Sequence, residues 1–156
     1  MNSDLIIMIF VQEEDALKAR QALEIMRDSG LLGLENAALV IKDSTGRAAV
    51  HQRWELPAYP RKPSSHLPVI FADAIFRSTS REGVQKLADA GLDERFLKDV
   101  THELGPSSSA LLIYVPHDSL VDTRRLLDTL GLFRGTLHHT TFPARVEGVI
   151  LEEANT

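Results

Sequence analysis

The 156-residue sequence contains no cysteine. Disulfide bonds, thiolate nucleophiles and cysteine metal ligands are therefore excluded from any account of its function. The absence of cysteine agrees with a reducing compartment, and we expect the protein to be cytoplasmic. The amino terminus also lacks the pattern of a signal peptide, because it has no basic start and no small-residue cleavage site.

Positive charge and long apolar runs are also scarce. Lys and Arg together number 17 against 22 Asp and Glu, which gives a net charge of -5. Nucleic-acid binding depends mostly on a basic surface, so we predict no nucleic-acid partner. The longest apolar runs, residues 5–11 and 110–115, are far shorter than the roughly 20 residues of a membrane helix. We therefore predict a soluble protein and expect no membrane association.

Motifs that carry a specific chemistry are missing as well. The sequence has no phosphate-binding glycine loop, no G-x-S-x-G elbow and no H-E-x-x-H. Three serines at 107–109 precede an apolar run, and we interpret them as a polar turn that enters a strand. The acidic residues 13–15 fit the first turn of a helix, where carboxylates complement the helix dipole. We predict no catalytic residue, no cofactor and no bound metal, and we favour a non-enzymatic role over an enzymatic one.

The clearest structural signal is a β-hairpin over residues 37–56. Apolar and β-branched residues lead into a turn-forming cluster, and alternating apolar residues follow it. Within the cluster, Asp43 can bond its own backbone, and Gly46 can adopt a positive φ without steric cost. The hairpin should form the middle of one sheet.

Hydrophobic periodicity predicts the elements on either side of this hairpin. A strand at 5–11 precedes a helix at 12–29. A proline-rich crossing at 57–68 follows the hairpin, and the chain ends in a weak tail at 143–156. Between them we predict a short helix at 69–76 and a second short helix that begins with a capping box of Thr79 and Glu82 and ends at Gly91. We also predict a helix at 93–104, a strand at 107–115, a helix ending at Gly131 and a strand at 135–142.

This order predicts a single α+β domain over residues 1–156. We expect a ferredoxin-like sandwich, β-α-β-β-α-β, with a C-terminal helix–strand extension. The third strand would pair between the first two, and the fifth would lie beside the fourth. All five strands would form one sheet with the helices on one face.

Two motifs resemble a known bacterial family. Residues 91–97, GLDERFL, and 105–111, GPSSSAL, are similar to segments of the family called "domain of unknown function 1269". The resemblance covers roughly residues 4–139 and includes the strand LIIMIFV and the hairpin. It implies a fold but little function, because the family is uncharacterised. Its members often carry a glycine-rich apolar segment after the hairpin, whereas residues 57–76 here are proline-rich and contain no glycine.

Histidines are the first candidates for ligand contacts. His51 lies on the predicted hairpin with Trp54, and His138 lies on the last strand with His139. If these strands met across a subunit contact, their imidazoles could bind zinc or another divalent ion. Adjacent strand residues point to opposite faces, however, so His138 and His139 cannot easily share one ion. We therefore interpret them as surface histidines.

The proline-rich crossing is the best candidate for partner binding. Its prolines at 57, 60 and 63 are spaced by three, as in a polyproline-II helix that docks in an aromatic groove. A rigid connection that covers one face of the sheet is the alternative. The candidate contact residues of the whole chain are His51, Trp54, Tyr59, Arg61, Lys62 and His138.

These observations favour a non-enzymatic oligomerisation or protein-interaction module, or a small regulatory subunit. An edge strand exposes unpaired amides, and the outer hairpin strand or residues 135–142 would be that edge. The expected partner is a second copy, in a homodimer or larger assembly, or another protein. One alternative is a small-molecule-binding or catalytic dimer with a pocket near Trp54, Tyr59 and His51. Peripheral membrane association, which only the family resemblance suggests, is another.

Overall fold

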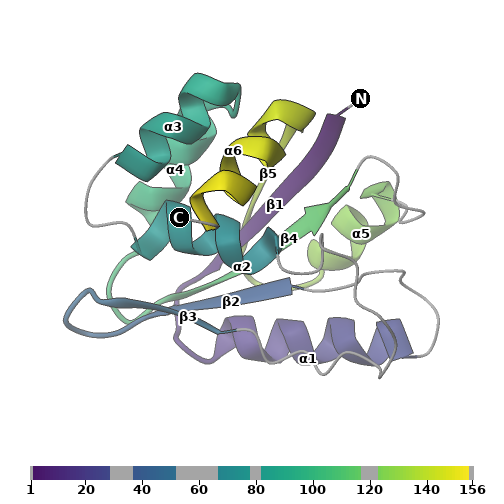
Figure 1. Cartoon of the computed structure of the whole chain (residues 1–156). Helices are drawn as coiled ribbons and strands as arrows, with labels where there is room; N and C mark the ends of the chain where they lie inside the picture. Colours follow the sequence, from purple (N-terminus) through teal and green to yellow (C-terminus); the bar gives the residue numbers. More distant parts are fainter. Residues whose placement is uncertain (1, 29–36, 52–66, 78–81, 117–122, 155–156) are drawn as a thin grey trace.

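One antiparallel sheet organises the chain. The computed structural model describes residues 2–28, 37–51, 67–77, 82–116 and 123–154 (Figure 1). Its strands are β1 (Asn2–Phe10), β2 (Ala37–Lys42), β3 (Ala48–His51), β4 (Ser109–Val115) and β5 (Thr136–Pro143). Its helices are α1 (Asp15–Asp28), α2 (Leu67–Ala72), the π-helix η2 (Asp73–Arg77), α3 (Glu82–Ala90), α4 (Glu94–Glu103), α5 (Thr123–Leu130) and α6 (Ala144–Ala154).

The order of the strands differs from the predicted one. The sheet runs β3-β2-β4-β1-β5, so the hairpin lies at one side of the sheet, and β4 instead of β3 lies between β1 and β2. The fifth strand pairs with β1, and the prediction that it lies beside β4 was wrong. All seven residues of β4 are buried, and such a strand needs neighbours on both sides. The short β3 and the polar β5 tolerate the exposure of an edge.

Helices cover both faces of the sheet, which corrects the prediction of one covered face. Helices α2, α3, α4 and α6 lie on one face together with η2, and α1 and α5 lie on the other (Figure 1). The reason is the continuous apolar sequence of β1. Ile7 packs into the core of the first face, and its neighbours Ile6 and Met8 pack into that of the second. A single layer of helices would leave one of these sets exposed to water.

The carboxyl-terminal segment is helical, although we predicted a weak tail. Val146 and Ile150 are four residues apart on α6, and both are buried in the core of the first face. This spacing is typical of an amphipathic helix. Pro143, just before the helix, and Gly148, within it, are poor helix formers, so the helical signal of this segment is weak.

The hairpin turn is confirmed in its details. The Asp43 carboxylate accepts hydrogen bonds from Thr45 N at 2.9 Å, Thr45 Oγ1 at 2.6 Å and Arg47 N at 2.9 Å. The bond from the Thr45 side chain, followed by that from the Arg47 amide, holds the pKa of Asp43 below its ordinary value. Gly46 has a φ of +87°, as the turn requires. The predicted extension over residues 52–56 lies outside the described residues.

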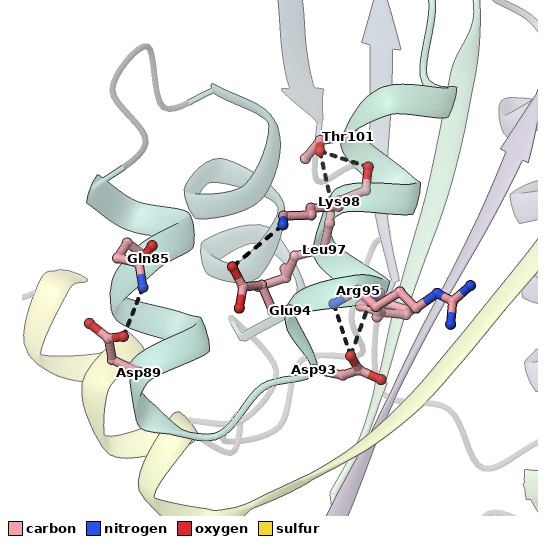
Figure 2. Close-up of polar contacts among 9 residues, drawn as sticks. Gln85, Asp89, Asp93, Glu94, Arg95, Leu97, Lys98 and Thr101 are labelled. Atoms are coloured by element: carbon pink, nitrogen blue, oxygen red, sulfur yellow. Dashed lines mark hydrogen bonds and ion pairs between the residues drawn. The ribbon is translucent and has the colours of Figure 1, made fainter.

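Helix α4 begins and ends as its sequence predicts. Asp93 is the N-cap residue, and its carboxylate accepts from Arg95 N at 2.9 Å and from Phe96 N at 3.4 Å (Figure 2). At the other end, Lys42 Nζ donates to the carbonyl oxygen of Leu104 at 2.9 Å. This bond attaches the hairpin to the end of α4.

Candidate functional site

Strand β5 forms one edge of the sheet. It pairs with β1 from Thr136, opposite Ile9, to Pro143, opposite Asn2. Among the residues that the structure describes, no strand pairs with its other side. The sequence predicts an exposed edge at the outer hairpin strand or at residues 135–142, and β3 and β5 are the two outer strands of the described sheet, in a strand order other than the predicted one.

The two faces of β5 have different surroundings. Phe142 lies in the core of the first face, where its ring centroid is 5.4 Å from that of Phe71. On the other face Leu137, His139 and Thr141 are exposed. Only one face of β5 is covered, which explains why the strand is polar in sequence although it pairs with β1 along its whole length.

His138 is held against α4. Its Nε2 is 2.7 Å from Oε2 of Glu103, the last residue of that helix. An ionised carboxylate only accepts hydrogen bonds, so the imidazole donates from Nε2. Its ring also stands edge-on to Phe96, with centroids 6.5 Å apart. The histidine thus fastens β5 to the helix that covers it.

His139 makes a similar contact on the opposite face. Its Nε2 is 2.9 Å from Oδ1 of Asp4 on β1. The prediction that His138 and His139 point to opposite faces is therefore confirmed. Sequence reasoning missed both carboxylates because Asp4 and Glu103 lie 135 and 35 residues away from their histidines.

The other candidate residues do not join this site. His51 ends β3 at the opposite edge of the sheet, so β2, β4 and β1 separate its strand from β5. The remaining candidates, Trp54, Tyr59, Arg61 and Lys62, lie outside the described residues, as does the proline-rich crossing. Within the described ranges, no three His, Asp or Glu side chains form a group that could hold a metal ion.

Ser108 and Ser109, at the start of β4, have structural contacts. Ser109 Oγ donates to the carbonyl oxygen of Gln12 at 2.6 Å and accepts from the amide of Ala16 at 3.1 Å. Ser108 Oγ donates to the carbonyl oxygen of Gly105. The bonds of Ser109 join the start of β4 to the start of α1, and the bond of Ser108 stays within the segment before β4, in keeping with the interpretation of the serines as a turn that enters a strand.

Three exposed apolar residues lie in the parts of the chain next to the beginning of β5. Val11 and Leu132 are 86% and 84% exposed, and Leu137 is 38% exposed. Val11 follows β1 at the end where Ile9 pairs with Thr136, and Leu132 lies four residues before Thr136. We call Val11, Leu132 and Leu137 the apolar corner. No sequence pattern indicates it, because only the pairing of β1 with β5 brings the segment of Val11 to the segment that begins β5.

Comparison with known proteins adds no assignment. The chain matches no family model, no curated protein and no solved structure at a significant level. The resemblance to "domain of unknown function 1269" therefore stays a prediction based on its two motifs. No helix within the described ranges is long and apolar enough to cross a membrane.

Proposed function

We propose that the protein is a non-enzymatic interaction module that self-associates by pairing β5 with β5 of a second copy. The open side of β5 at the edge of the sheet carries this proposal. Two antiparallel copies of the strand, related by a two-fold axis, would satisfy the outward amides and carbonyls of both. The result would be one continuous sheet across the dimer.

The composition of β5 favours pairing with itself. Proteins usually protect an exposed edge with lysine, an internal proline, a bulge or a very short strand. None of the eight residues of β5 is Lys, Arg, Asp or Glu, and its only proline is the last residue, Pro143. Two copies would therefore meet without repulsion between like charges.

The apolar corner supports the same surface. Val11, Leu132 and Leu137 account for most of the large hydrophobic side chains that are exposed in the described residues, the others being Ile25 and Leu151. Exposed apolar side chains are stabilised when a partner removes them from water. Their position beside β5 would add apolar contacts to the hydrogen bonds between the strands.

The arrangement of the strands also supports the ferredoxin-like fold that the sequence predicts. Without β3 the order is β2-β4-β1-β5, with β4 in the place between the first two strands. Helices α1 and α5 lie on the same face, as the two crossover helices of such a sandwich do. We propose that β3 and helices α2–α4 are an insertion into this core.

The mass of the protein in solution tests the proposal. Light scattering across a concentration series should give a dimer or a larger even assembly for the wild type. Leu137→Lys should shift the protein toward monomer, because it places a charge on the paired strand. Ile25→Lys is the matched control, since Ile25 is 68% exposed on α1, away from β5. A monomeric wild type at high concentration, or equal effects of both variants, would contradict the proposal.

A further inference from the structure

His139 lies on the exposed face of β5 with one ring nitrogen turned toward β1. Its Nε2 is 2.9 Å from Oδ1 of Asp4, and an ionised carboxylate only accepts hydrogen bonds. A neutral imidazole carries one proton on its two nitrogens, so this bond places the proton on Nε2 and leaves a lone pair on Nδ1. The His139 side chain is 33% exposed, which keeps the ring accessible to a ligand from solvent.

The shape of the ring directs this lone pair away from β1. The two nitrogens of an imidazole point in divergent directions, so when one faces a neighbour the other faces away from it. Because Nε2 faces Asp4 on β1, Nδ1 faces the other side of β5. That side is the open edge of the sheet, where no strand of the described ranges pairs with β5.

The pair of His139 and Asp4 resembles half of a metal site. A histidine that binds a metal through one nitrogen usually donates the other N–H to a carboxylate, which fixes the tautomer and the orientation of the ring. One chain alone is not enough, because its described residues hold no group of three side chains that could bind a metal ion. A further ligand must therefore come from a second molecule.

Antiparallel pairing of β5 with itself supplies that ligand. The eight-residue strand overlaps its copy most fully when the two-fold axis passes at residue 139 or 140. An axis at 139 pairs residues 136–142 and leaves out Pro143, which cannot donate a backbone hydrogen bond. The residue on the axis faces its own copy, with Cβ atoms about 4.5–5.5 Å apart. This register brings the two His139 side chains together on one face of the shared sheet.

We infer that the β5 dimer binds one zinc ion between the Nδ1 atoms of its two His139 side chains, a site that rests on the proposed self-association. Imidazole nitrogen suits zinc, whereas magnesium and calcium prefer oxygen ligands. Asp4 of each copy orients its histidine, the two carboxylates offset the charge of the ion, and water completes the coordination. Because the site needs both copies, zinc strengthens the dimer.

Sedimentation equilibrium of the full chain in EDTA and in ZnCl₂ tests the site. In EDTA the wild type should form the dimer that the proposed function requires. Zinc at about ten times its own dissociation constant should lower the dissociation constant of the dimer about tenfold. Equilibrium dialysis should find one zinc ion for two chains, and MgCl₂ should leave the dimer unchanged.

Three variants separate the ligand from its surroundings. His139→Gln should form the dimer in EDTA but lose the response to zinc. Asp4→Asn should keep the response and bind zinc about 10-fold to 100-fold more weakly, since Asp4 acts through the histidine. His102→Gln, which removes an exposed histidine of α4, is the matched control and should respond as the wild type does.

Two kinds of result would overturn the zinc site and leave the self-pairing of β5 intact. One is a wild-type dimer whose dissociation constant zinc does not change. The other is an equal response to zinc in the wild type and in His139→Gln. A wild type that stays monomeric at high concentration, both in EDTA and in ZnCl₂, would overturn the self-pairing and the zinc site together.

Discussion

Gly135, the residue before β5, leaves no room for a side chain. A Cβ atom at this position would lie 2.9 Å from the carbonyl oxygen of Ile9 and 2.9 Å from Cε1 of Phe10. Ordinary contacts begin at 3.4 Å, so the chain must shift by about half an ångström. Neither neighbour yields easily, because one is backbone of β1 and the other is a ring that is only 2% exposed. Gly135→Ala should therefore displace the beginning of β5 from β1.

Overpacking of this kind costs about 1–3 kcal/mol. For a chain of this length each kcal/mol lowers Tm by about 2–4 °C, so thermal unfolding should occur about 2–12 °C earlier. Gly148→Ala is the matched control. No atom lies within 4 Å of its added Cβ, and alanine favours the helix there by about 0.5–1 kcal/mol. A Gly135→Ala protein as stable as wild type would refute the close approach of β5 to β1.

Three further predictions concern stability. Ile150→Ala should lower the free energy of unfolding, measured by urea denaturation, by about 2–5 kcal/mol. Leu151→Ala, at a site that is 39% exposed, should lower it far less. Equal losses in the two variants would contradict the packing of α6. Asp93→Ala should lower the free energy of unfolding by about 1 kcal/mol, and with it Tm, because α4 loses its N-cap. Asp89→Ala, which removes a surface carboxylate, should change Tm little. Folding lowers the pKa of Asp43. The Asp43 carboxylate therefore contributes to the stability of the fold at pH values above its ordinary pKa of 3.8, and this contribution is lost as the pH falls through its pKa in the folded protein. The difference in Tm between wild type and Asp43→Ala should therefore shrink in acid, and a difference that grows would contradict the turn geometry.

The local elements could be predicted because their signals are local. The turn at Asp43 and Gly46 and the cap at Asp93 each depend on residues within four positions, and the structure confirms all of them. The strand order could not be predicted in the same way. A buried apolar run such as β4 specifies that the strand is central but not which neighbours it has.

The candidate site shows the same limit. The last strand and its two histidines could be placed on opposite faces from the alternation of side chains alone. Their partners Asp4 and Glu103 belong to β1 and α4, and only the tertiary pairing of these elements brings them to β5. The apolar corner depends on the same pairing. Helix α6 is different, because the spacing of Val146 and Ile150 is a local signal, although Pro143 and Gly148 are poor helix formers.

Disulfide crosslinking tests the self-pairing of β5 most directly. The chain has no cysteine, so a single cysteine introduced at position 138, 139, 140 or 141 can form a disulfide only with a second copy. The residue on the two-fold axis faces its own copy, with Cβ atoms about 4.5–5.5 Å apart. One β5 position should therefore crosslink much faster than its neighbours, and faster than Ile25→Cys on α1. If no β5 position crosslinks faster than Ile25→Cys, the two copies do not pair through this strand.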